Sequence, residues 1–300
     1  MNLTDPIFTD ETKAREYFES IRWPEGPNCP HCGEVKRVYR LEGKSHRPGL
    51  FHCNRCNGQF TVTTGSVMES SHIPLTKWAM GFRLYAGSKK GFSANQLHRS
   101  LGITYKSAWF MAHRIREAMS EGNPEPMGGN GDVVEIDETY VGRKPGTKKG
   151  KGGAHKNVVL TLVTRGGKAR SFHVNGTSAK ELLPYVYKHV MQDTHIMTDE
   201  AHPYGRLGET YASHQFVTHG ADEYVRGNVT TNTVEGFFSI FKRGMKGVYQ
   251  HCSERHLQRY LREFDFRYSN REKVGVNDME RTVRAIQGGM GKRLTYQHPR

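Results

Sequence analysis

The sequence lacks the features of membrane-bound and secreted proteins. No apolar run approaches the ~18 residues that a membrane-spanning helix needs, and residues 1–6 lack the basic and apolar regions of a signal peptide. Only five cysteines occur, and four of them lie in two close pairs, unlike a secreted disulfide framework. These absences exclude an integral membrane protein and predict a cytoplasmic one.

Acidic residues are also scarce relative to basic ones. Thirty Asp and Glu residues stand against 44 Lys and Arg residues, which gives a formal net charge of +14. Such an excess favours a polyanionic partner, most often nucleic acid, although a merely basic protein would have the same balance. With 300 residues, the chain can form two or three modules, one of them with a sizeable core.

The paired cysteines predict a metal site. Each Cys-x-x-Cys turn can place two thiolates on one ion, and two such turns complete a tetrahedral zinc site. The alternatives are a redox pair or a disulfide pair, but a redox motif would not need its spaced duplicate. We therefore expect one structural Zn²⁺ in a zinc ribbon, within a first module over residues 1–66 that begins with a helix at 9–21. The expected zinc ligands are Cys29, Cys32, Cys53 and Cys56.

A helix-turn-helix-like DNA-binding region is predicted over residues 67–122. Ser93 and Thr104 can cap two successive helices, and Gly102 between them allows the turn. The first residues of the second helix would then be exposed, where such helices contact bases and phosphates. An ordinary helical hairpin is the alternative. The candidate DNA contacts here are Tyr105, Lys106 and Ser107.

Three carboxylates interrupt or end apolar segments beyond a linker at 123–131. Asp137 follows the β-branched start of an expected strand, Asp199 ends a second strand, and Glu235 lies near the start of a helix. A buried charge is costly unless it is paired or bound to a metal. Carboxylates on three separate elements can hold two divalent cations, Mg²⁺ or Mn²⁺. The alternatives are solvent-exposed turn acids and, for Glu235, a surface ion pair.

The order of the expected elements predicts how the carboxylates meet. Three strands, a helix, a strand and further helix follow one another over residues 132–275, the order of an RNase H-like domain with a mixed sheet. In that fold the first and fourth strands are neighbours, which brings Asp137 and Asp199 together. Glu138 and Glu200, the next residues along, would point to the opposite face. The overall fold class is thus a multidomain α+β and α/β protein, with a basic tail at 276–300.

Two clusters of basic residues flank the expected catalytic elements. The glycine-rich stretch at 143–153 carries five positive charges and no acid, so it is expected to contact DNA phosphates without sequence preference. A solvated loop is the alternative. The expected helix at Glu235 continues with further cations on its exposed side. The candidate contacts in the two clusters are Lys148, Lys149, Lys151, Lys242, Arg243 and Lys246.

These motifs resemble those of bacterial insertion-sequence DDE transposases of the ISXO-like branch, which join a zinc ribbon to an RNase H-like domain. The matching segments are the two cysteine pairs and residues 136–142, 198–200 and 232–239. The resemblance implies metal-dependent cleavage at terminal inverted repeats and strand transfer into target DNA. It implies that Asp137, Asp199 and Glu235 are catalytic, with Asn232 as a second candidate because this branch varies between Asn and Glu. Cuts at two ends imply at least a dimer on DNA.

Two other functions fit the same motifs. One is a zinc-ribbon DNA-binding regulator whose RNase H-like domain is inactive, which would bind specific DNA without cutting it. The other is an RNase H or Holliday-junction nuclease, which would hydrolyse its substrate without strand transfer.

Overall fold

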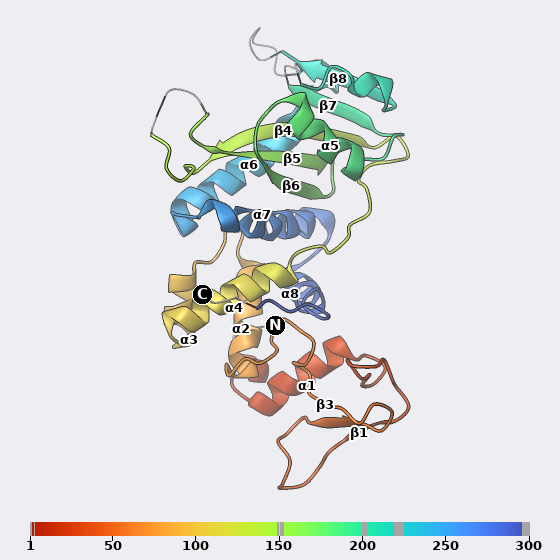
Figure 1. Ribbon diagram of the computed structural model, residues 1–300, viewed down its shortest axis with the longest axis vertical. Coiled ribbons are helices and arrows are strands. Elements are labelled where there is room, and N and C mark those ends of the chain that lie inside the picture. Colours follow the sequence, from red (N-terminus) through yellow and green to blue (C-terminus); the bar gives the residue numbers. More distant parts are fainter. Residues whose placement is uncertain are drawn as a thin grey trace. The chain divides into compact units, whose positions relative to one another are not determined.

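The computed structural model describes residues 2, 4–148, 150, 153–199, 203–218 and 225–295 (Figure 1). The chain divides into two compact units. The first comprises Met1–Ser88, Phe92–Ser120 and Asn277–Arg300, and the second Lys89–Gly91 and Glu121–Val276. Within the described ranges, no helix has the length and apolar character needed to cross a membrane.

The first unit combines a small antiparallel sheet with a group of helices. Its strands, in the order β1-β2-β3, are β1 (Val38–Arg40), β2 (Phe51–Cys53) and β3 (Gln59–Phe60). Its longer helices are α1 (Glu11–Arg22), α2 (Leu75–Gly87), α3 (Ala94–Leu101), α4 (Tyr105–Ala118) and α8 (Asp278–Gln287). Strand β2, with one cysteine of the second pair at its end, was not predicted because three residues give no periodic signal.

The small sheet has a small hydrophobic core, which contributes little to its stability. Trp23, which follows α1, packs edge-on against Phe51 and Phe60 with ring centroids 5.2 Å and 5.7 Å apart. The two phenylalanines stack on each other at 5.5 Å. Three aromatic rings and eight strand residues are a small core, so a second source of stability is expected here.

The segment predicted to be a helix-turn-helix forms two capped helices, α3 and α4. The Ser93 hydroxyl accepts a hydrogen bond from the N–H of Gln96 (3.1 Å), and the Thr104 hydroxyl accepts one from Ser107 (3.2 Å). Gly102 ends α3 in the left-handed region at φ 59°, where a side chain would be strained. The caps and the turn were predictable because each rests on a local backbone requirement.

The prediction of a basic tail over 276–300 was wrong for its first half. The side chain of Asn277 caps α8 by accepting a hydrogen bond from the N–H of Glu280 at 2.9 Å. Ala285 and Ile286 are fully buried, and Arg281 donates to the carbonyl of Ala86 at 3.0 Å. This helix completes the first unit from the far end of the chain, and only long-range packing reveals that role.

The second unit is built on a five-stranded mixed sheet in the order β6-β5-β4-β7-β8. Its elements are β4 (Val133–Val141), β5 (Asn157–Thr164), β6 (Ala169–Val174), α5 (Ala179–His189), β7 (His195–Asp199), β8 (Ser213–Val217), α6 (Asn232–Gly244) and α7 (Glu254–Ser269). The central strand β4 runs antiparallel to β5 and parallel to β7, so the first and fourth strands are neighbours as predicted. Strand β8 was not expected because its sequence, SHQFV, is mostly polar. In the structure the strand is only partly buried.

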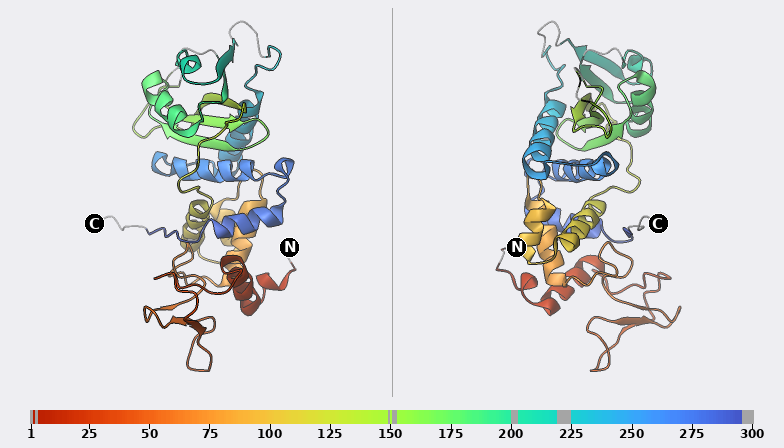
Figure 2. Two further views of the ribbon diagram at one scale, coloured as in Figure 1. Left: turned by 90° about the vertical axis from the view of Figure 1, so that its right-hand side faces the viewer. Right: turned by 60° about the vertical axis from the view of Figure 1, so that its left-hand side comes forward.

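Helices cover both faces of this sheet, with α5 on one side and α6 and α7 on the other (Figure 2). Neighbouring residues in a strand point to opposite faces. Val134 and Ile136 pack in the core beneath α5, whereas Glu135 hydrogen-bonds to the start of α6. Asp137, two residues later, therefore faces α6 as well. This alternation decides which acids of β4 can meet Glu235.

Helix α7 covers the open edge of β6. Three N–H groups along that edge donate to α7 side chains: Ala169 to Ser269 Oγ (3.1 Å), Ser171 to Asp265 Oδ2 (2.8 Å) and His173 to Gln258 Oε1 (2.9 Å). The side-chain amide of Gln258 donates back to the carbonyl of Ser171 at 2.9 Å. An uncovered edge strand invites pairing with other chains. The polar face of α7 thus replaces a sixth strand.

Asp265 at the middle of this edge is expected to make the stability of the second unit depend on pH. Burial raises its pKa to about 7, although Ser171 donates two hydrogen bonds to it. Because its pKa is higher in the folded chain, its stabilising contribution is complete below about pH 4 and is lost as the pH rises through 7. Asp265→Asn preserves the shape, so the unfolding free energy of the wild type should fall relative to this variant over that range. Chemical denaturation of both proteins from pH 4 to 8 measures the difference; parallel curves would contradict the expectation.

Candidate active site and cysteine cluster

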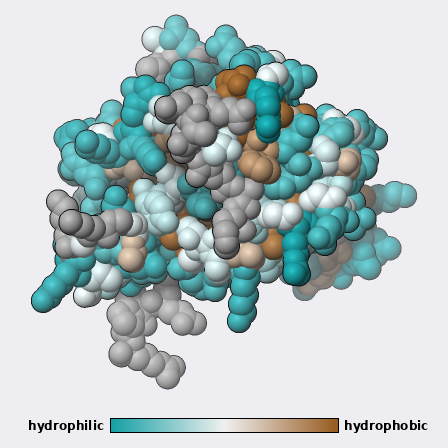
Figure 3. Space-filling view, turned by 90° about the horizontal axis from the view of Figure 1, so that it is seen from above, coloured by the Kyte–Doolittle hydropathy of each residue, from teal (hydrophilic) through white to brown (hydrophobic). Residues whose placement is uncertain are grey.

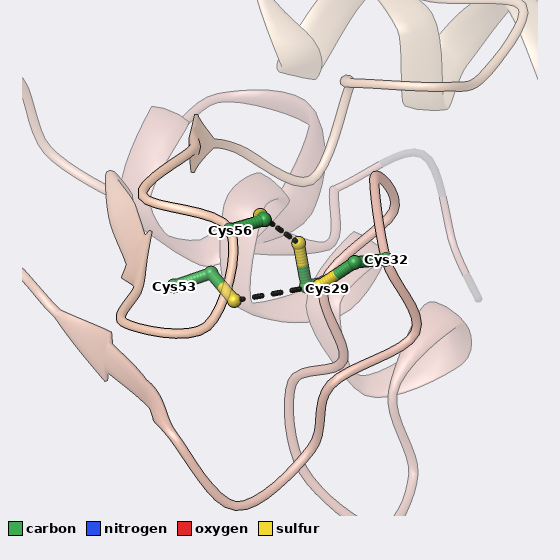
Figure 4. A group of neighbouring side chains, drawn as sticks. All are labelled: Cys29, Cys32, Cys53 and Cys56. Carbon is green, nitrogen blue, oxygen red and sulfur yellow. Dashed lines mark hydrogen bonds between the residues drawn. The ribbon is translucent and has the colours of Figure 1, made fainter.

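The four predicted zinc ligands meet in the first unit. Their Sγ atoms all lie within 4.8 Å of one another, with Cys29 to Cys56 at 3.6 Å and Cys32 to Cys53 at 3.7 Å. They come from two loops that face each other (Figure 4). No disulfide joins them.

This cluster fits one zinc ion. Zinc–sulfur bonds of about 2.3 Å in a tetrahedron place neighbouring sulfurs about 3.8 Å apart, close to both separations in the cluster. All four ligand positions are filled by cysteine, which leaves no open position for a substrate. An ion here would therefore be structural, and it would supply the stability that the small sheet lacks.

In the second unit, Asp137 lies in the middle of β4. The sequence had suggested a place at the open end of the strand. The strand continues to Val141 because β5 pairs with it as far as Asn157. On its other side, the pairing of β4 with β7 is last seen at Ile136 and Thr198. The side chain of Asp137 therefore lies beside the point where β7 ends, at Asp199.

Asp199 ends β7 as predicted and is the residue next to Asp137 across the two strands. The pKa of Asp137 is raised to about 8, first by burial and then by the negative charges of Asp199, Glu138 and Glu235. Asp199 and Glu235 thus lie near Asp137 on its own face of the sheet, and Glu138 adds its charge from the other face. Such an arrangement attracts a cation.

Glu235 lies in the first turn of α6, on an exposed part of the helix. The hydroxyl of Thr231, itself buried, donates to Glu235 Oε1 at 3.1 Å. Asn232 is the first residue of the helix, three positions before Glu235 and so on the same side, and it is also exposed. The structure therefore brings Glu235 to the acids of β4 and β7 and leaves Asn232 beside it.

The oxygen donors suit a hard divalent cation, because Mg²⁺ and Mn²⁺ prefer carboxylate ligands. Among the described residues, only the four cysteines bring three or more potential ligand atoms within 4.8 Å of one another. The carboxylates of Asp137, Asp199 and Glu235 are spread more widely.

Glu138 lies on the other face of β4, as expected, but it has a partner that sequence reasoning missed. The hydroxyl of Tyr204 donates to Glu138 Oε2 at 2.6 Å, and the tyrosine is 1% exposed. Burial raises the pKa of Glu138. No local pattern marks Tyr204, which lies five residues after Asp199 in an irregular segment. Glu200, the other acid expected on this face, lies outside the described residues.

The predicted DNA contacts lie on both units. Tyr105 and Lys106 at the start of α4 are exposed, and Ser107 is half-buried. In the second unit Lys148, Lys242, Arg243 and Lys246 are exposed, whereas Lys149 and Lys151 lie outside the described residues. The face seen in Figure 3 is mainly hydrophilic, with small, separate hydrophobic areas. Exposed cations on a hydrophilic surface are available to a polyanion.

Residues 129–269 match the model of the ISXO2-like transposase domain, and residues 9–59 match that of the transposase zinc-ribbon domain. The chain belongs to the ISXO2-like transposases. It is 28% identical over 279 residues to a protein of the transposable element ISH50 from Halobacterium salinarum, with 87% of this chain and 91% of the relative covered. The predicted family is thereby confirmed, and the archaeal relative extends it beyond bacteria.

Proposed function

We propose that the chain is an active DNA transposase that cuts at the terminal inverted repeats of its element and joins the ends to target DNA. The observation that carries this proposal is the convergence of three acids from β4, β7 and α6 on one face of a mixed sheet. The strand order β6-β5-β4-β7-β8, with only the last three strands parallel, supports an RNase H-like catalytic domain.

Asp137, Asp199 and Glu235 would hold two Mg²⁺ or Mn²⁺ ions, with Asn232 as the alternative to Glu235. Bound there, the ions would activate the attacking hydroxyl and stabilise the charge on the leaving 3′-oxygen. The pKa of Asp137 is raised first by burial and then by the neighbouring negative charges, and it is these charges that such ions would neutralise.

The protein's own part is to orient the reacting groups and to hold the DNA. Thr231 fixes the Glu235 carboxylate by hydrogen bonding. Lys242 is two helical turns beyond Glu235, and with Arg243 and Lys246 it offers exposed cations to the phosphates beside the scissile bond. No covalent bond between protein and DNA is required.

The first unit would recognise the element ends. The exposed start of α4, with Tyr105, Lys106 and Ser107, is the part of a helix-turn-helix that contacts base edges. The zinc ribbon would add contacts at the same ends. Because an element has two ends, we propose at least two copies of the chain on DNA.

A cleavage and joining assay tests this function. Zinc-loaded protein is mixed with Mg²⁺, a labelled duplex carrying the element's terminal repeat and an unlabelled target duplex, with Asp199→Ala as the control. The expected result is nicking at the 3′ end and joining to the target, both lost in the control. Nicking without joining would favour the nuclease. Tight binding without cleavage by either protein, in Mg²⁺ and in Mn²⁺, would favour the inactive regulator.

A further inference from the structure

A fourth acid, Glu135, lies on the same face of β4 as Asp137, two residues before it. Its side chain is fully buried, with an exposed fraction of 0%. From its position alone it could be another ligand for a metal ion. Its hydrogen bonds show a different role.

Both carboxylate oxygens of Glu135 are occupied. Oε1 accepts from Arg165 Nε at 2.7 Å and from the hydroxyl of Thr233 at 2.8 Å. Oε2 accepts from the backbone N–H groups of Thr233 at 2.7 Å and Val234 at 3.1 Å. Four donors and complete burial leave no lone pair directed at a metal ion. Glu135 is therefore unsuited to be a ligand.

The two backbone N–H groups that donate to Glu135 belong to the first turn of α6. The N–H groups of a first turn have no partners within the helix and need others. The residue before the helix, Thr231, does not cap it, because its hydroxyl donates to Glu235 instead. Glu135 thus caps the helix from a neighbouring strand. A carboxylate there also interacts favourably with the helix dipole.

Arg165 at the end of β5 completes the connection. Besides Glu135, it donates to the carbonyl of Thr230 at 3.0 Å, just before the helix. The start of α6 is therefore held through both its N–H groups and its preceding carbonyl. The next residue after Val234 is Glu235. Residues two apart in a strand are separated by about 7 Å, so a helix start fixed at Glu135 lies within reach of Asp137.

We propose that Glu135, supported by Arg165, is a positioning residue that places Glu235 against Asp137 and Asp199. It acts through α6 and does not touch the metal or the DNA. This inference rests on the proposed function, since it assumes that Glu235 is the third ligand. It predicts that loss of the cap lowers the affinity for divalent ions while the rest of the fold persists.

The test measures Mn²⁺ binding to the zinc-loaded full chain, both by calorimetry and by the electron paramagnetic resonance signal of free Mn²⁺. In Glu135→Gln, the side-chain NH₂ would face N–H or O–H donors, with which it cannot form hydrogen bonds. The cap of α6 would therefore be lost. We expect about a tenfold loss in Mn²⁺ affinity, as for other groups that orient metal ligands. Glu235→Gln should show a similar loss, and the double variant should bind no more weakly than Glu235→Gln alone.

Glu263→Gln is the matched control. Glu263 is equally buried and pairs with an arginine, Arg267, but it lies on α7 and accepts a hydrogen bond from Tyr249, which follows the end of α6. Its substitution should leave the Mn²⁺ affinity unchanged. If Glu135→Gln does not fold, Thr233→Val removes only one of the four donors and should weaken Mn²⁺ binding about two- to threefold.

The outcomes separate this inference from the proposed function. Wild-type Mn²⁺ affinity in a folded Glu135→Gln or Thr233→Val variant would overturn the positioning role and leave the transposase proposal intact. Additive losses in the double variant would also overturn it, since Glu135 would then act independently of Glu235. Absence of Mn²⁺ binding by the wild type would overturn both.

Discussion

Asp137→Asn is expected to reduce cleavage at the element ends by at least about 10³-fold. Removing one ligand of a two-metal site costs several kcal/mol of transition-state stabilisation, and about 4 kcal/mol corresponds to that factor. Single-turnover cleavage rates in saturating Mg²⁺ provide the measurement. Glu138→Gln is the matched control, because its side chain lies on the opposite face, hydrogen-bonded to Tyr204. Its rate should stay within about tenfold of the wild type.

The same Asp137→Asn variant, loaded with zinc, should be more thermally stable than the wild type when no Mg²⁺ or Mn²⁺ is present. Burial and the charges of Asp199, Glu138 and Glu235 oppose ionisation of Asp137, as its raised pKa indicates. An uncharged isostere removes that repulsion. Added Mg²⁺ should then stabilise the wild type and leave the variant unaffected. A variant that cleaves like the wild type, or that melts at a lower temperature than the wild type without Mg²⁺ and Mn²⁺, would contradict the role assigned to Asp137.

Loss of zinc is expected to have the second large effect. The sheet that carries the cysteines has eight strand residues, and its aromatic core is small. Structural zinc contributes about 10–16 kcal/mol in zinc-finger peptides, far more than this core can supply. Cys53→Ser should therefore unfold the ribbon, reduce the zinc content from one ion per chain to none, and reduce binding to the terminal repeat by at least about tenfold.

Atomic absorption and gel-shift titration measure the two quantities. Cys252→Ser is the matched control, because Cys252 lies outside the cluster and in the other unit. It should keep one zinc ion and wild-type DNA affinity. One zinc ion and unchanged affinity in Cys53→Ser would mean that the cluster is not a structural zinc site.

Local patterns were sufficient for much of this chain. The spacing of the four cysteines predicted their cluster, because two short turns leave the thiolates few other arrangements. Ser93, Gly102 and Thr104 predicted the helix boundaries of α3 and α4, since caps and left-handed turns depend on adjacent backbone groups. The apolar runs predicted β4 and β7 and, with the order of elements, their pairing.

Elements with weak local signals were missed or misplaced. Strands β2 and β8 are short or polar, and α8 lies within a segment that looked only basic. The point at which β4 loses its pairing with β7, just before Asp137, depends on where β7 ends, and the sequence of β4 does not contain that information. Each of these features is determined by partners distant in the chain.

The sequence by itself indicated the family, the cysteine cluster and the three acids proposed as metal ligands in the second unit. Only the tertiary structure distinguished Glu135 from Asp137, although both are acids on the same face of one strand. Glu135 meets four donors from β5 and α6 and is fully buried, whereas Asp137 lies where the neighbouring strand ends and other acids gather. The surroundings of a carboxylate, supplied by residues some thirty to a hundred positions away, decide whether it caps a helix or is left to the role of metal ligand that we propose for Asp137.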